Sequence, residues 1–177
     1  AFSRDIEMMK GGYEDSFYMQ LIKNVRAYKG TPSESKAFSK SIDISGGLKQ
    51  WEDVTNVYRA IGTASYGRNS TDCAGQSKYV MEAPRNNLQE IRVTHDQENI
   101  YFYIRAEKEI TGSGANWMNI FIGTGSPSLK GWEGYEYVIN RSVNGSTGSI
   151  ERLKEEYTGE SVGEARLVQS GEYLFVE

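Results

Sequence analysis

The sequence predicts an all-β protein, a two-sheet antiparallel β-sandwich of jelly-roll-like type preceded by one N-terminal helix. Twelve tyrosines and nineteen glycines among 177 residues favour strands and tight turns. From Ile42 onward, short segments that alternate apolar and polar residues recur, separated by clusters of Asp, Asn, Gly and Ser. Only the segment before residue 31 has a helical period.

The N-terminal segment, residues 1–30, carries this helical pattern. Apolar residues recur every three or four positions over residues 13–28 and form one stripe on a helix. Asp15 and Ser16 are suitable caps, and Gly30 ends the pattern. An amphipathic helix must bury its stripe. It therefore packs on the rest of this chain, or it is the tail of a preceding domain.

The remaining chain divides into a linker and one domain. Residues 31–41, TPSESKAFSKS, are polar and serine-rich, which is typical of a linker. Residues 42–177 carry the strand patterns and are expected to form the sandwich. The predicted strands are residues 41–44, 77–81, 88–94, 99–106, 117–122, 135–140, 150–154, 165–169 and 172–176.

Side-chain alternation predicts which face of the central strands is buried. In NIYFYIRA the even-numbered residues are apolar and are expected to face the core, whereas Tyr101, Tyr103 and Arg105 take the other face. In WMNIFI both faces carry bulky residues, which favours a central strand. The residues of NIYFYIRA that are expected in the core are Ile100, Phe102, Ile104 and Ala106.

Composition and charge exclude several function classes. The net charge is −4 and the pI is about 5.2, and no basic cluster that could follow phosphates occurs, so no nucleic acid partner is expected. No apolar run approaches the ~20 residues of a membrane span. With one cysteine, Cys73, and one histidine, His95, neither an internal disulfide, a zinc centre nor a Ser-His-Asp triad is expected.

The acidic residues form no catalytic pattern. No pair of carboxylates stands out by spacing as the acid pair of a hydrolase, which favours a protein that is not an enzyme. Calcium is the one cofactor for which the sequence offers candidates, because Asp43 and Asp53 lie near the first predicted strand and Ca²⁺ prefers oxygen ligands. No spaced ligand series such as an EF-hand loop is present, so solvated surface carboxylates are the alternative.

The stretch GWEGYEYVINR, residues 131–141, places a tryptophan between glycines. Sugars present flat faces of C–H bonds that stack on indole and phenol rings, and their hydroxyls bind planar polar groups. Trp132 and Trp117 are each either a ligand platform or a packed residue, whereas Trp51 is expected to anchor the first strand. The candidate ligand-binding residues are Trp132, Trp117, Glu133, Asn116, Tyr135 and Arg141.

Three segments resemble one known domain. In order they are DQENIYFYIRAEKEIT, NWMNIFIG and GWEGYEYVINR. They resemble the β-sandwich domain at the C-terminal end of certain bacterial glycoside hydrolases and, more distantly, family 9 carbohydrate-binding modules. The resemblance covers roughly residues 15–141, and the hairpin motif is its most specific part. In such domains the second strand often ends F-I-D, whereas here it ends in Gly123.

The resemblance implies a non-catalytic accessory module that binds oligo- or polysaccharide. Such a module is attached to the catalytic domain of the same polypeptide and lies outside the cell, at the cell surface or in the periplasm. Residues 1–30 would then be the last helix of that catalytic domain. The alternative is a structural β-sandwich domain that supports a catalytic domain without binding sugar. Exposure of the Trp132 ring is the cheapest observation that separates the two.

Overall fold

The computed structural model describes most of the chain in two compact units, Ala1–Lys36 and Ala37–Glu177. The first contains α1 (Ser16–Lys29), which lies where the sequence predicts a helix. Gly30 follows it with a φ of 81°, the left-handed conformation in which many helices end. Within the described residues no helix is long and apolar enough to cross a bilayer. The described residues are 16–30, 38–60, 68–71, 78–81, 85–114, 117–125, 131–154 and 157–177.

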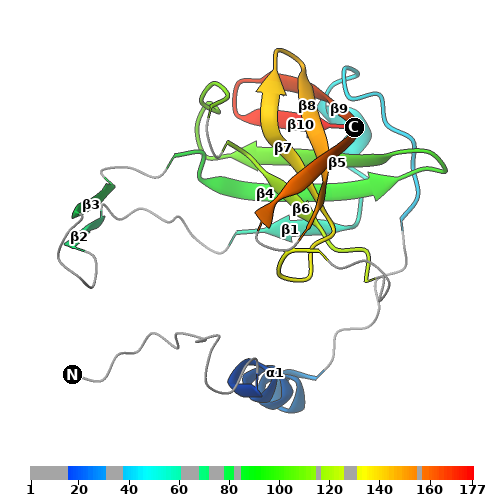
Figure 1. Ribbon diagram of the computed structural model, residues 1–177. Coiled ribbons are helices and arrows are strands. Elements are labelled where there is room, and N and C mark those ends of the chain that lie inside the picture. Colours follow the sequence, from blue (N-terminus) through cyan, green and yellow to red (C-terminus); the bar gives the residue numbers. More distant parts are fainter. Residues whose placement is uncertain are drawn as a thin grey trace. The chain divides into compact units, whose positions relative to one another are not determined.

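The second unit is mostly antiparallel β structure, as predicted (Figure 1). Its main sheet has eight strands in the order β1-β4-β5-β10-β9-β8-β7-β6. A separate pair joins β2 (Arg68–Thr71) to β3 (Lys78–Met81). The strands of the main sheet are β1 (Val57–Arg59), β4 (Leu88–His95), β5 (Ile100–Ala106), β6 (Ile120–Ile122), β7 (Tyr137–Asn144), β8 (Thr147–Leu153), β9 (Gly159–Ser170) and β10 (Tyr173–Val176).

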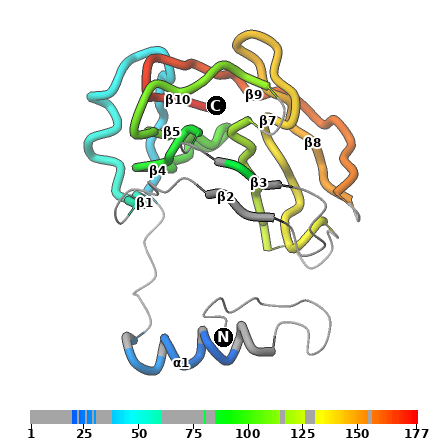
Figure 2. The backbone as a smooth tube through the Cα atoms, turned by 90° about the vertical axis from the view of Figure 1, so that its left-hand side faces the viewer, coloured from blue at the N-terminus to red at the C-terminus, as the bar shows by residue number. Residues whose placement is uncertain are grey.

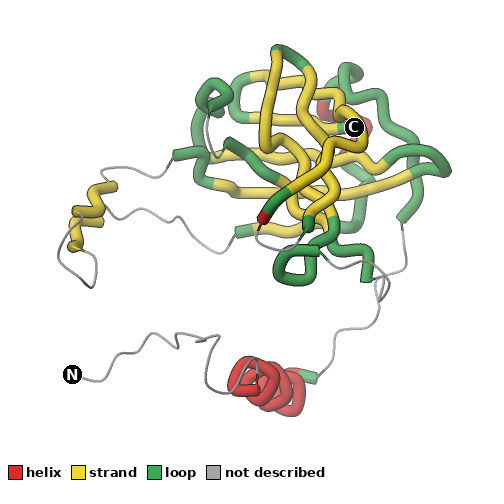
Figure 3. Tube along the Cα trace, viewed as in Figure 1, coloured by secondary structure: helices red, strands yellow, loops and turns green. Residues whose placement is uncertain are grey.

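Strand β9 joins the two halves of this sheet. Its residues 159–166 pair with β8, and its residues 167–170 pair with β10. The sheet curls along this long strand, so that the β5–β10 half and the β7–β8 half turn towards each other as a half-barrel (Figures 2 and 3). Backbone hydrogen bonds therefore connect one curled sheet in the described part of the chain. The predicted antiparallel β architecture is confirmed, and the predicted division into two sheets is not.

One hydrophobic cluster fills the inside of the half-barrel. In β5, Phe102, Ile104 and Ala106 face this inner cluster, as their alternation predicts, whereas Ile100 at the strand start is 47% exposed. Trp117 lies in the same cluster. Its buried members are Phe102, Ile104, Ala106, Ile110, Trp117, Ile139, Ala165, Leu167, Leu174 and Val176.

A second cluster covers the opposite side of β5 and β10. Tyr101, Tyr103 and Phe175 project outward there and are buried by the segment of residues 38–54. Trp51, on a short 3-10 helix (Leu48–Trp51), packs its ring against Tyr103 and Phe175 at centroid distances of 5.6 and 6.1 Å. The expected anchoring role of Trp51 is thus seen in its packing.

Residues 41–44 do not form the predicted strand. Ile42 and Ile44 are buried in the second cluster, which accounts for their alternation. The backbone of Asp43 is bonded to the side chain of Gln50, whose Oε1 accepts from the Asp43 N–H and whose Nε2 donates to the Asp43 carbonyl. A side chain therefore satisfies the groups that a neighbouring strand would otherwise bind.

Strand β6 is an edge strand, and the prediction of a central position for it is wrong. Ile120 and Ile122 pack against the inner cluster. Phe121 points the other way and contacts a group of aromatic rings. Bulk on both faces therefore indicates two covered faces, and it says nothing about the number of neighbouring strands.

Asp96 holds the turn between β4 and β5. Its Oδ1 accepts hydrogen bonds from the backbone N–H groups of Glu98 and Asn99 at 2.9 and 2.8 Å. Its Oδ2 accepts hydrogen bonds from the Tyr101 hydroxyl and the Ser41 hydroxyl. These bonds, led by that from Tyr101, stabilise the charged form and hold the pKa of Asp96 well below its usual range.

We expect Asp96 to stabilise the fold above about pH 4 and to lose this contribution as the pH falls. Because its pKa is lowered by folding, the unfolded chain takes up the proton first, near the ordinary Asp pKa of ~3.9. Asp96→Asn should therefore be less stable than the wild type at pH 7, and the difference should narrow towards pH 2. Thermal unfolding across this range measures it, with Glu98→Gln in the same turn as control. A difference that stays constant with pH would contradict the assignment.

Candidate functional site

The stretch GWEGY forms a tight hairpin between β6 and β7. The N–H of Trp132 donates to the Tyr135 carbonyl at 3.0 Å, and the N–H of Tyr135 donates to the Trp132 carbonyl at 2.9 Å. Glu133 and Gly134 form the two-residue loop with φ of 55° and 85°. Two positive φ values are typical of a type I′ turn. Residues paired in this way share one face, so Trp132 and Tyr135 project together.

Two glycines allow the hairpin to close. A Cβ on Gly131 would lie 1.9 Å from the Tyr135 carbonyl oxygen, so no larger residue fits without moving the backbone. A Cβ on Gly123 would lie 2.9 Å from the Gly134 carbonyl oxygen. Gly123, which stands where the resembling domains often have Asp, thus lies where the end of β6 approaches the hairpin closely.

The buried carboxylate of Glu136 fixes the loop after β6 to the same hairpin. Its Oε2 accepts a hydrogen bond from the backbone N–H of Thr124. The backbone of Glu136 itself bonds to the carbonyl of Ile122 at 2.9 Å and accepts from the N–H of Leu153 at 2.7 Å. Glu136 is 5% exposed, so its carboxylate has a structural role, which is to hold the loop after β6 against the hairpin.

Four aromatic rings gather around this hairpin, and we call them the aromatic patch: Phe121, Trp132, Tyr135 and Tyr157. The ring of Trp132 lies 4.8 Å from that of Tyr157 and 5.8 Å from that of Phe121 between centroids. Phe121 also lies 5.5 Å from Tyr135. Tyr135 is 42% exposed and Tyr157 is 36% exposed, whereas Trp132 is half-buried. The patch therefore offers ring surface to solvent on a packed base.

Strand register places the patch on the outer face of the half-barrel. Phe121 pairs with Val138, and Val138 pairs with Glu151. Their chain neighbours Ile120 and Ile139 pack in the inner cluster, so these three residues point outward. Val138 is fully buried although it faces away from the inner cluster, so protein atoms cover the outer face at this row.

Arg141 borders the patch. Its guanidinium lies 4.0 Å from the centroid of the Tyr157 ring, and its Nη2 donates to the Tyr157 carbonyl at 2.7 Å. Its Nη1 forms an ion pair with Glu151 at 2.8 Å. Gly159 lies against this pair, since an added Cβ would meet the Glu151 carboxylate at 2.4 Å. Arg141 and Glu151 thus form a fixed, partly buried polar border beside the exposed rings.

The structure brings some of the predicted residues together and separates others. Trp132 and Tyr135 belong to the aromatic patch, Arg141 borders it, and Glu133 is exposed in the loop between the first two. Trp117 lies in the inner cluster, is 3% exposed, and donates its indole N–H to the Thr111 carbonyl at 2.7 Å. Its ring is thus not offered to a ligand. Asn116 lies outside the described residues.

Sequence reasoning missed Phe121 and Tyr157 as members of the patch. Phe121 belongs to WMNIFI, where bulky residues on both faces predict two covered faces but no particular neighbour. Tyr157 precedes β9 in a segment without alternation, and it reaches the patch because the preceding strand β8 pairs with β7. Only the aromatic character of KEEYTGE could have drawn attention to it.

The two calcium candidates have protein partners. Asp53 pairs with Lys40 at 2.6 Å, which lowers its pKa through that hydrogen bond. Asp43 accepts from the N–H of Ser45 at 2.9 Å and lies 3.7 Å from Arg166. In the part of the chain that the structure describes, no three His, Cys, Asp or Glu side chains are grouped as metal ligands. Calcium binding at Asp43 and Asp53 stays a prediction, which titration with CaCl₂ would test.

Comparison with known proteins adds no relative. No family model, curated protein or solved structure matches the chain. The resemblance to family 9 carbohydrate-binding modules therefore stays a prediction.

Proposed function

We propose that this chain is a non-catalytic carbohydrate-binding module, an accessory domain of a secreted or cell-surface glycoside hydrolase. The observation that carries the proposal is the aromatic patch, where the exposed rings of Tyr135 and Tyr157 flank the half-buried Trp132. In this proposal the two halves of the main sheet, which share β9, act as the two layers of a jelly-roll-like sandwich. The ligand is an oligo- or polysaccharide.

The chemistry of the patch suits a sugar ring. The C–H face of a pyranose buries apolar area on a phenol or indole ring, and its hydroxyls need charged or amide partners nearby. Arg141 and Glu151 supply donors and acceptors beside Tyr157, and their ion pair holds them in place. A preorganised border of this kind reduces the entropy that is lost on binding.

A structural domain that supports a catalytic domain without binding sugar is the second candidate. The observation that favours it is the packing of Trp132, whose ring contacts Phe121 and Tyr157 at 5.8 and 4.8 Å. On this alternative the exposed rings are covered by the neighbouring domain of the same polypeptide. The two candidates differ in whether the isolated chain binds glycans.

We expect Tyr135→Ala to weaken glycan binding about thirtyfold, since half of a tyrosine side chain against a sugar contributes about 2 kcal/mol. Affinity electrophoresis against plant and bacterial polysaccharides identifies a ligand, and isothermal titration calorimetry measures its affinity. Tyr58→Ala is the matched control, because Tyr58 is 60% exposed on β1 at the opposite edge of the sheet.

The stability of the same variants separates the two candidates. If sugar binding is the role of the patch, Trp132→Ala and Tyr135→Ala lose affinity while the chain stays folded. If no polysaccharide binds the wild type, and Trp132→Ala only lowers the unfolding temperature, the structural alternative holds. Equal affinities of Tyr135→Ala and Tyr58→Ala would also remove the patch from the proposal.

A further inference from the structure

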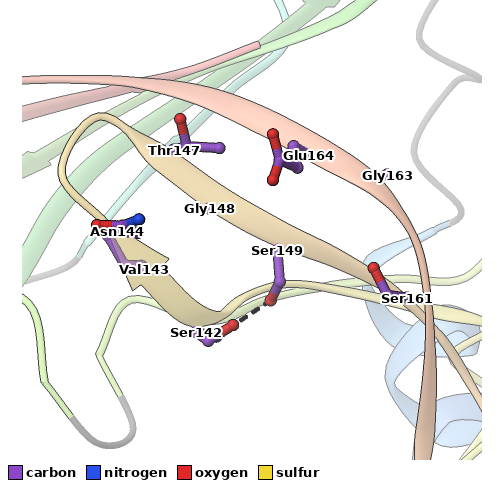
Figure 4. A pocket seen from close by; sticks show the side chains of 9 residues that line it. All are labelled: Ser142, Val143, Asn144, Thr147, Gly148, Ser149, Ser161, Gly163 and Glu164. Carbon is purple, nitrogen blue, oxygen red and sulfur yellow. Dashed lines mark hydrogen bonds between the residues drawn. The ribbon is translucent and has the colours of Figure 1, made fainter.

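A polar groove lies on the outer face of β7, β8 and β9, and we call it the serine groove (Figure 4). Its volume is about 430 Å³. Short hydroxyl and glycine residues dominate its lining, and Glu164 supplies a carboxylate. The lining residues are Ser142, Val143, Asn144, Thr147, Gly148, Ser149, Ser161, Gly163 and Glu164.

Irregular strand pairing accompanies the groove. The register shifts between Ile139 and Val143 where β7 pairs with β8, and again between Ile150 and Glu151 where β8 pairs with β9. Such bulges bend a strand and re-aim its side chains. Because the residues on both sides are small, the bend leaves a hollow that no side chain fills.

The groove and the aromatic patch are parts of one strip. The Ser149 hydroxyl accepts a hydrogen bond from the N–H of Ser142 at 3.1 Å (Figure 4). The same hydroxyl donates to the Glu151 carboxylate at 3.3 Å. Glu151 pairs with Arg141, whose guanidinium lies over the Tyr157 ring. A hydrogen-bonded path therefore leads from the groove to the patch. The four steps along β8 from Thr147 to Glu151 span about 14 Å.

The charges along the strip favour a neutral ligand. The carboxylate of Glu151 is neutralised by Arg141, whereas Glu164 is exposed and has no ion-pair partner among the described residues. An unpaired carboxylate accepts hydrogen bonds from hydroxyls and repels other carboxylates. Uronic acid or sulfated chains would thus meet an unfavourable charge in the groove.

We infer that the serine groove is a second subsite, and that the ligand is a neutral linear oligosaccharide that extends from the aromatic patch along β8. One sugar stacks on the patch, and the following sugars hydrogen-bond to Thr147, Ser161 and Glu164 in the groove. This inference rests on the proposed function, to which it adds the chain length, direction and charge of the ligand.

Chain-length dependence of affinity tests the inference on the wild-type protein. Neutral oligosaccharides of glucan, xylan and mannan type, from disaccharides to hexasaccharides, are titrated calorimetrically beside an oligogalacturonate series. We expect affinity to rise about tenfold from short to long neutral chains, as one or two added hydrogen bonds would produce, and acidic chains to bind more weakly. Equal affinity for all lengths would overturn the inference.

Two groove variants and one control locate the added affinity. Ser161→Tyr fills the groove from an exposed strand position and should reduce long chains to the affinity of short ones, whereas Ser113→Tyr, in an exposed loop, should change nothing. Glu164→Gln should raise the affinity for acidic chains. If Tyr135→Ala weakens glycan binding while Ser161→Tyr and Glu164→Gln have no effect, the groove is not a subsite and the proposed function stands. If no glycan binds, both fail.

Discussion

Replacing Trp51 by alanine should lower the free energy of unfolding by about 3–5 kcal/mol, the range found when a buried tryptophan is truncated. Trp51 is 2% exposed, stacks on Phe175 and packs in a tilted arrangement against Tyr103. Its removal would leave a cavity between the outer side of β5–β10 and the segment of residues 38–54. That segment has few backbone hydrogen bonds to the sheet, so side-chain packing has to hold it there.

The neighbourhood of Trp51 strengthens this expectation. Arg92 donates to the carbonyls of Trp51 and Val54 at 2.7 and 3.2 Å and is itself paired with Glu90 at 2.7 Å. Displacing residues 48–54 would leave the Arg92 guanidinium without these two acceptors. The loss therefore combines a cavity with broken charge-assisted hydrogen bonds.

Urea unfolding of matched variants measures this prediction. Leu48→Ala changes the same helix at a residue that is 44% exposed, so it should cost well under about 1 kcal/mol. Trp51→Phe should fall between the two, because it also removes an indole N–H that is buried without a hydrogen-bond partner among the described residues. Equal losses for Leu48→Ala and Trp51→Ala would show that the second cluster does not hold residues 38–54 to the sheet.

Alternation predicted the faces of the central strands because it is a local property. Phe102 and Ile104 face inward, and Tyr101 and Tyr103 face outward, as the period of two requires. What alternation does not contain is the path of β9 through both halves of the sheet. The segment 159–164 is exposed, polar and glycine-containing, and only its pairing with β8 makes it a strand.

The segment NGSTGS shows the same limit from another side. Its glycines and serines predict a break between the strands of residues 135–140 and 150–154, yet β7 runs to Asn144 and β8 begins at Thr147 after a two-residue turn. Gly148 lies within β8, and a Cβ there would be 2.0 Å from the Asn140 side-chain oxygen. This glycine is therefore needed for a close approach and not for a turn. A glycine needed for a close approach cannot be distinguished, in sequence, from a glycine needed for a turn.

The sequence predicted only those residues of the candidate site that are close to one another along the chain. Trp132 and Tyr135 are paired across two residues, and glycines on either side of Trp132 indicated a turn. Tyr157 lies in the connection from β8 to β9 and joins them because β8 pairs with β7. Trp117 leaves them because Met118 has a φ of 46°, which breaks the alternation before β6. Both outcomes depend on backbone geometry that residue types did not reveal.

Substituting Gly131 by alanine should open the hairpin and abolish the aromatic patch. The added Cβ would lie 1.9 Å from the carbonyl oxygen of Tyr135, 2.6 Å from its carbonyl carbon and 2.9 Å from the Cα of Glu136. All three are backbone atoms, so no rotation of a side chain relieves the overlap. Both hydrogen bonds between Trp132 and Tyr135 have to break, and we expect a loss of about 1–3 kcal/mol in stability.

The functional consequence is larger than the loss of stability. With the hairpin open, Trp132 and Tyr135 no longer share a face, so Gly131→Ala should weaken glycan binding at least as much as Tyr135→Ala although both rings are still present. Gly112→Ala is the matched control, because no atom lies within 4 Å of the Cβ that it adds. Calorimetric titration together with thermal unfolding of both variants measures the effect. Wild-type affinity in Gly131→Ala would mean that the arrangement of the rings, and with it the aromatic patch as a binding surface, is irrelevant to the ligand.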